Sequence, residues 1–89
     1  MEKSIITVVG KDKVGIIADI CMLLKQENVN ILDISQTIVD GFFNMMMIVD
    51  TSSCADFFLL SEKLEEKGKE LNVEVKLQKE EIFSYMQRL

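Results

Sequence analysis

The chain of 89 residues contains no histidine, no proline and no tryptophan, and its one arginine is Arg88. The absence of histidine removes the commonest member of catalytic triads, zinc sites and proton shuttles that work near neutral pH. The absence of proline, together with only four glycines, favours regular secondary structure joined by short turns. The composition therefore indicates an ordered domain without the usual catalytic machinery.

Charge and hydropathy exclude two classes of partner. The formal net charge is −5, and no run of lysine or arginine supplies the basic face that nucleic acid or an anionic membrane requires. The apolar stretches are interrupted by Asp19 and Asn44, so no segment is long enough to span a bilayer. Glu2 and the short apolar run after it do not form a signal peptide.

The two cysteines, Cys21 and Cys54, are far apart and lack the spacing of a metal or redox motif. We expect Cys21 in the core and Cys54 at the start of a helix, both as reduced thiols. The sequence therefore predicts a cytoplasmic protein that needs no metal and no cofactor. A chain of this length forms one domain, which hides only about 60–65% of its unfolded surface, so a partner subunit would add stability.

Hydrophobic periodicity divides the chain into alternating strands and helices. Asp40 and Gly41 form the strongest hairpin signal, and Ser53 to Asp56 resembles a capping box that opens the second helix. Gly68 is expected to interrupt or end that helix. The predicted elements are strand 4–9, helix 14–27, strand 31–40, strand 42–50, a helix after 53–56, strand 73–78 and a short amphipathic helix within 80–89.

This order predicts an α+β fold, a ferredoxin-like βαββαβ sandwich with both helices on one face of an antiparallel sheet. Right-handed crossovers and the hairpin favour the strand order 4-1-3-2. The first and third strands are apolar on both faces, as central strands are. The second and fourth alternate, as edge strands do, with Leu32, Ile34 and Ile38 on one face of the second.

The first helix is apolar around its whole circumference, with Asp19 as nearly its only polar residue between Gly15 and Leu24. One stripe comprises Val14, Ile17, Cys21 and Leu24, and a second comprises Ile16, Ile20 and Leu23. A sheet covers only one side of such a helix. We therefore expect a second covering surface.

The loop from Gly10 to Gly15 is the first candidate site. Asp12 is placed to cap the helix, and Lys11 and Lys13 add positive potential to backbone N–H groups that suit a carboxylate. Gly15 costs about 0.5–1 kcal/mol against alanine in a first helical turn, which suggests close approach of a ligand. The alternative is a tight turn whose glycine packs against the sheet.

Asn28 and Asn30 are the second candidate, because an amide can both donate to a carboxylate and accept from an ammonium. The alternative is an ordinary turn, in which asparagine is common because it tolerates left-handed conformations. Met45, Met46 and Met47 alternate between faces of a strand, so we interpret them as core residues rather than a metal site.

No catalytic constellation is evident in the sequence. Acylphosphatases share this topology but use an arginine in the first loop, for which Lys11 or Lys13 is an imperfect substitute. Copper chaperones place a Cys-x-x-Cys there. RNA-recognition motifs place aromatics on the third strand, where residues 41–43 give only a faint similarity and the charge has the wrong sign.

The chain resembles the ACT domain family over nearly its whole length. Two segments, 8–18 and 28–37, carry the motifs of this resemblance. Its pattern is a strand followed by Asp, a basic residue, Pro, Gly and an aliphatic run, and later an Asn-Ile that opens the second strand. The similarity is greatest to single-domain bacterial ACT proteins such as the UPF0237 group and to the ACT halves of glycine-cleavage regulators. It implies an ACT domain over 1–79 followed by the helix within 80–89. Val14 departs from the pattern, which often has proline there.

The resemblance implies a regulatory homodimer or higher homo-oligomer that binds a small molecule, an amino acid, rather than an enzyme. In such dimers the second strands pair, the first helices lie together, and the ligand sits between the first loop of one subunit and the second strand of another. The regulated partner would be a metabolic enzyme or a transcriptional regulator. The alternatives are a ligand-free interaction module and, third, an acyl-phosphate hydrolase using Lys11 or Lys13. The ligand site implied here comprises Asp12, Lys13, Val14, Gly15, Asn28, Asn30 and Ile31.

Overall fold

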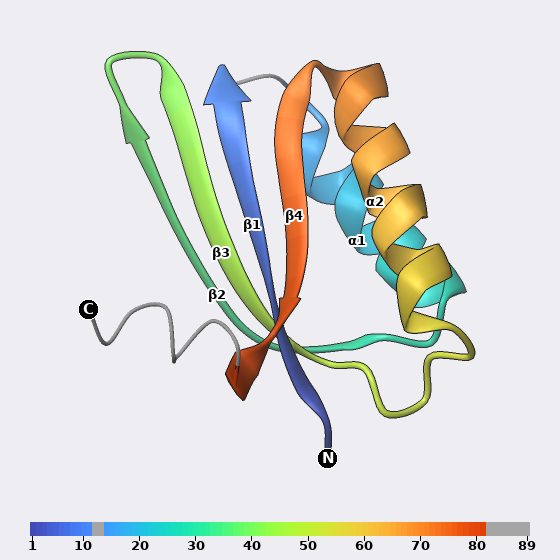
Figure 1. Ribbon diagram of the computed structural model, residues 1–89. Helices are drawn as coiled ribbons and strands as arrows, with labels where there is room; N and C mark the ends of the chain where they lie inside the picture. Colours follow the sequence, from blue (N-terminus) through green and yellow to red (C-terminus); the bar gives the residue numbers. More distant parts are fainter. Residues whose placement is uncertain (12–13, 82–89) are drawn as a thin grey trace.

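A four-stranded antiparallel sheet forms one layer of the molecule, and two helices lie against one of its faces (Figure 1). The computed structural model describes residues 1–11 and 14–81. The elements are β1 (Lys3–Lys11), α1 (Ile16–Gln26), β2 (Asn30–Val39), β3 (Phe42–Asp50), α2 (Phe57–Leu71) and β4 (Val73–Lys79). The strand order β2-β3-β1-β4 confirms the predicted ferredoxin-like topology. Residues 82–89, most of the predicted C-terminal helix, lie outside the described residues.

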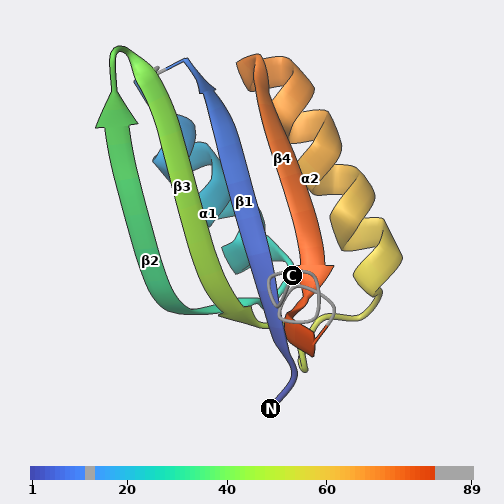
Figure 2. The ribbon, with the colours of Figure 1, turned by 60° about the vertical axis from the view of Figure 1, so that its left-hand side comes forward.

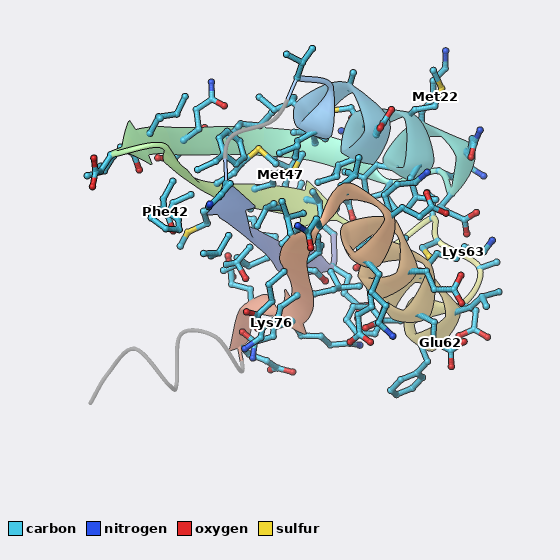
Figure 3. All side chains as sticks on the ribbon, turned by 90° about the horizontal axis from the view of Figure 1, so that it is seen from above. Met22, Phe42, Met47, Glu62, Lys63 and Lys76 are labelled. Atoms are coloured by element: carbon cyan, nitrogen blue, oxygen red, sulfur yellow. The ribbon has the colours of Figure 1, made fainter. Side chains whose placement is uncertain are left out.

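The core fills the space between the sheet and the helices. Met45 and Met47 of β3 are buried in it, and Met46 between them is exposed, as the alternation predicts. Met47 is labelled in Figure 3. The open face of the sheet has neither α1 nor α2 on it, as Figure 2 shows from the side of the strands. The most deeply buried apolar side chains of the core are Ile6, Val8, Ile16, Ile20, Leu24, Met47, Val49, Leu60 and Leu64.

Helix α2 packs closely on β4 because Gly68 has no side chain. A Cβ atom at Gly68 would lie 2.8 Å from the carbonyl oxygen of Val73 and 2.9 Å from Cγ2 of Val75. The prediction that Gly68 interrupts or ends the helix was therefore wrong, since the helix continues to Leu71. This glycine permits the close contact between the two elements.

The start of α2 differs from the predicted capping box. The N-cap is Asp56, whose carboxylate accepts hydrogen bonds from the backbone N–H groups of Phe58 (3.1 Å) and Leu59 (3.2 Å). Ser53 lies upstream of the helix. Asp56 itself is a favoured N-cap residue, and it satisfies two of the free N–H groups of the first turn.

The turn between β2 and β3 confirms the hairpin signal. Asp40 and Gly41 have φ values of 54° and 81°, so both lie in the left-handed region that a tight two-residue hairpin requires. At the other end of β2, the register shifts between Ile31 and Asp33, which leaves Leu32 without a direct partner on β3. Simple alternation, on which the prediction placed Leu32 on the same face as Ile34, is therefore interrupted at Leu32.

Candidate functional site

The first half of the predicted site lies at the N-terminal end of α1. The helix begins at Ile16, and Gly15 is its N-cap, so the predicted start at Val14 was wrong. Val14 is fully exposed and takes no part in an apolar stripe. Asp12 and Lys13 lie outside the described residues.

Gly15 serves a conformational purpose in the described part of the chain. Its φ is +91°, and a Cβ atom built on it would meet no described atom within 4 Å. It therefore does not pack against the sheet, so the interpretation of Gly15 as a glycine packed in a tight turn was wrong, and the close approach of a ligand stays a prediction. The left-handed backbone turns the chain into α1 at a position where L side chains are strained.

The second half lies at the opposite end of α1, where the helix ends in a left-handed turn. Asn28 has φ 60°, its N–H donates to the Lys25 carbonyl at 3.2 Å, and the N–H of Val29 donates to the Leu24 carbonyl at 2.9 Å. Val29 and Leu24 are both buried. This is a Schellman ending, in which the two N–H groups satisfy the last carbonyls of the helix. The left-handed turn accounts for an asparagine at position 28. Asn30 is not part of this turn, and it is exposed.

A shallow cavity of about 610 Å³ opens beside this turn. Three of the predicted residues line it, Asn28, Asn30 and Ile31, so the structure brings this half of the predicted site together. Sequence reasoning missed the other four lining residues. These are Cys21, Lys25, Val29 and Ser53.

The spacing of two of the missed residues, Cys21 and Lys25, could have revealed them in the sequence. Cys21 and Lys25 are four apart, so they lie on one face of α1, and the chain then leads directly to Asn28. Cys21 is half-buried against the core rather than enclosed in it, which corrects the predicted core position in part. Ser53 comes from the loop after β3, and only the folded chain places it here.

Two acidic side chains close to this cavity in the sequence or in the sheet, Glu27 and Asp50, already have interaction partners. Glu27 forms an ion pair with Lys63 at 2.9 Å. Asp50, opposite Asn30 in the β2–β3 register, accepts hydrogen bonds from the backbone N–H groups of Ser52 (3.0 Å) and Glu2 (3.3 Å). Hydrogen bonds from the Ser52 side chain and then its backbone lower the pKa of Asp50 from its ordinary value of 3.8. These contacts anchor the chain that leads into Ser53.

The two halves of the predicted site are separated by the length of α1. The helix has 11 residues, and at 1.5 Å per residue its ends lie roughly 16 Å apart. A small amino acid cannot touch both Gly15 and Asn30 of one chain at that separation. The predicted ligand residues of one copy therefore form two separate groups, which we call the predicted half-sites.

Apolar surface lies uncovered between these half-sites. Met22 is 58% exposed and projects away from the sheet, as Figure 3 shows. On β2 every residue is exposed except Ile31, which is half-buried, and Ile38 and Val39 are 58% and 64% exposed. The sequence pattern predicted that the sheet would leave part of α1 uncovered, and the structure confirms it.

The described residues contain no group of three or more histidine, cysteine, aspartate or glutamate side chains arranged to hold a metal ion. Neither α1 nor α2, the helices of the described part of the chain, is long and apolar enough to cross a membrane.

Comparison with known proteins gives concordant results. The family model described as "ACT domain" matches residues 2–78. The UPF0237 protein of Bifidobacterium longum is 56% identical over 90 residues, which cover all of both chains. The solved ACT domain protein from Streptococcus pneumoniae is 44% identical, covers 92% of this chain and 93% of its own, and superimposes with a TM-score of 0.81.

A more distant solved structure, the regulatory subunit of aspartate kinase from Thermus thermophilus, shares the fold. It is 22% identical, with a TM-score of 0.68, and the match covers 86% of this chain and half of that subunit. The match at this identity concerns the fold alone.

Proposed function

The chain belongs to the ACT domain family, and from this premise we propose that it is a stand-alone regulatory module that binds an amino acid between two copies of itself. ACT domains are regulatory, ligand-binding modules rather than a catalytic family, and they commonly form oligomers. The solved neighbour from Thermus thermophilus is itself a regulatory subunit.

The observation that carries this proposal is the placement of the two half-sites at opposite ends of α1. Two α1 helices packed side by side in opposite directions would bring Gly15 of one copy next to Asn30 of the other. The exposed Met22 and the exposed strand β2 are the surfaces that such an arrangement would cover. Burial of these surfaces would also supply stability that a domain of this size lacks alone.

The chemistry of the two half-sites fits an amino acid. The N-terminal end of α1 offers backbone N–H groups and the positive end of the helix dipole, which favour a carboxylate by about 0.3–1 kcal/mol. The side-chain amides of Asn28 and Asn30 both donate and accept, so they suit an ammonium and a carboxylate alike. The regulated partner would be a metabolic enzyme or a transcriptional regulator.

A thermal-shift screen of the purified protein against the twenty amino acids at millimolar concentration tests the proposal. A ligand at one hundred times its Kd adds about 2.7 kcal/mol, and each kcal/mol moves the midpoint by roughly 4–8 °C in a domain of this size. We expect a selective rise that is lost in Asn30→Ala and retained in Asn72→Ala. Asn72→Ala controls for the loss of an asparagine elsewhere, because Asn72 lies at the C-terminal end of α2 and does not line this cavity.

A second function, a ligand-free interaction module, is favoured by the same uncovered apolar surface, since α1 and β2 would pack against another chain without any ligand. A dimer in solution with no response to any amino acid would support this alternative. A monomer at micromolar concentration with a ligand bound would contradict the composite site.

A further inference from the structure

Lys25 gives the cavity beside α1 a positive charge that no other lining residue balances. It is the one charged residue among those that line the cavity, and it forms no ion pair within residues 1–11 and 14–81. Glu27, the nearest acid along the chain, already holds Lys63 at 2.9 Å. The ammonium group of Lys25 is therefore available to a ligand.

Hydrogen-bond donors surround the same cavity. Asn28, Asn30 and Ser53 line it together with Lys25, and their side chains carry amide and hydroxyl donors. An ammonium with several neutral donors and no carboxylate is a set that recognises a carboxylate, because charge-assisted hydrogen bonds are about twice as strong as neutral ones.

This half-site is separate from the one that would take the ligand's main-chain carboxylate. In the proposed function that carboxylate lies against the backbone at Gly15 of the other copy. Lys11, exposed at the end of β1, adds a further cation on that side. The composite site thus collects lysines from both copies, although the chain as a whole carries a net charge of −5.

We infer that the amino acid bound here carries a second carboxylate in its side chain, and that Lys25 selects it. The inference rests on the proposed function and concerns the same site. Cys21, four residues before Lys25 on the same face of α1, forms the uncharged wall beside the ammonium. An acidic side chain would fill this end of the cavity, and its neutral amide analogue would leave the ammonium without a countercharge.

Calorimetric titration of the full chain with aspartate, glutamate, asparagine and glutamine tests the inference. We expect an acidic amino acid to bind roughly tenfold or more tightly than its amide, the ratio that one charge-assisted contact supplies. Binding should weaken as salt is raised. Lys25→Met should remove the preference by weakening the acidic ligand alone, and Lys25→Arg should retain it.

Lys69→Met is the matched control. Lys25 and Lys69 each occupy the last turn of a helix, so both interact favourably with the helix dipole, but Lys69 lies on α2 away from this cavity. If Lys25 only stabilised its helix, the two variants would lower the thermal midpoint alike and leave the preference intact. We expect Lys69→Met to bind as the unaltered protein does.

The outcomes separate the inference from the proposed function. Tighter binding of a neutral amino acid, with no effect of Lys25→Met on affinity, would overturn the role of Lys25 and leave an amino-acid sensor. Absence of binding by all four acidic and amide ligands and by the other sixteen amino acids would overturn both.

Discussion

The two edges of the sheet differ in how they meet solvent. At one edge, β4 lies under α2, with Val73 and Val75 buried, and the outward residues Glu74 and Lys76 form an ion pair at 3.3 Å. At the other edge, β2 is exposed along nearly its whole length and carries a single charge, Asp33. One edge strand of the sheet, β4, is therefore covered by a helix and charged, whereas the other, β2, is exposed and nearly uncharged.

This difference predicts which side of the molecule would contact a second copy in the proposed dimer. Charged side chains on an edge strand discourage pairing with a second chain, and a long uncharged edge invites it. The pattern on β4 is that of a protected edge. We expect β2, together with the exposed face of α1 beside it, to be the side on which a second copy packs.

The largest expected loss of stability comes from a substitution in the core beneath α2. Leu64 of α2 is fully buried, and Leu64→Ala should lower the free energy of unfolding by about 2–5 kcal/mol because it leaves a cavity. Urea denaturation at low micromolar protein measures the loss. Ile38→Ala on β2, where the side chain is 58% exposed, should cost less than half as much at that concentration. Equal losses would mean that the two sides are equally packed in the single chain.

A charge placed on the bare edge should come next. Ile34 is 40% exposed on β2, and Ile34→Lys should weaken the proposed dimer at least tenfold by placing like charges in its interface. Sedimentation equilibrium over a concentration series measures the dissociation constant. Glu74→Lys on β4 is the control and should leave the dimer intact. Dissociation by the β4 variant instead would reverse the assignment of the two edges.

A smaller effect distinguishes the observed N-cap of α2, Asp56, from the predicted one, Ser53. Asp56→Ala should destabilise the protein by about 1 kcal/mol, because the first turn of α2 loses both side-chain hydrogen bonds. Ser53→Ala should change stability by less than about 0.5 kcal/mol, since Ser53 caps nothing. Thermal denaturation of both variants checks this. A larger loss for Ser53→Ala would restore the capping box expected from the sequence.

The smallest expected effect is on acid stability at the base of β3. Hydrogen bonds lower the pKa of Asp50 below 3.8, so the folded state binds its proton less readily than the unfolded state does. The stability that Asp50 contributes is therefore complete above its unfolded pKa and is lost as the pH falls through the lower folded value. Asp50→Asn should remove this part of the acid sensitivity below about pH 4. Stability curves of both proteins between pH 2 and 6 measure it, and identical slopes would contradict the assignment.

The sequence predicted the element order and the strand order, because both depend on local patterns. The alternation of β4 and the doubly apolar β3 identified an edge strand and a central strand, and Asp40 with Gly41 identified the hairpin. Helix boundaries were predicted less well. Gly15 and Asp56 were not recognised as the N-caps of α1 and α2, since neighbouring residues such as Asp12 and Ser53 offered capping side chains.

The candidate site was predicted in part. Asn28, Asn30 and Ile31, which the resemblance to the ACT domain family marked as ligand residues, line one cavity, and their binding of a ligand stays a prediction. The same resemblance grouped them with Val14 and Gly15, which lie at the far end of α1 in the same chain. The sequence alone gives no distance between these two groups of residues. The length of α1, which joins them, gives that distance once the helix is known.

The sequence by itself determined the secondary structure, the topology and the family, because hydrophobic periodicity and turn chemistry act over a few neighbouring residues. Only the tertiary structure decided that Ser53 joins Lys25 at one cavity, that β2 rather than β4 is left bare, and that the predicted ligand residues form two half-sites. These features arise where segments distant in the chain pack together, and packing depends on the shape of every side chain between them.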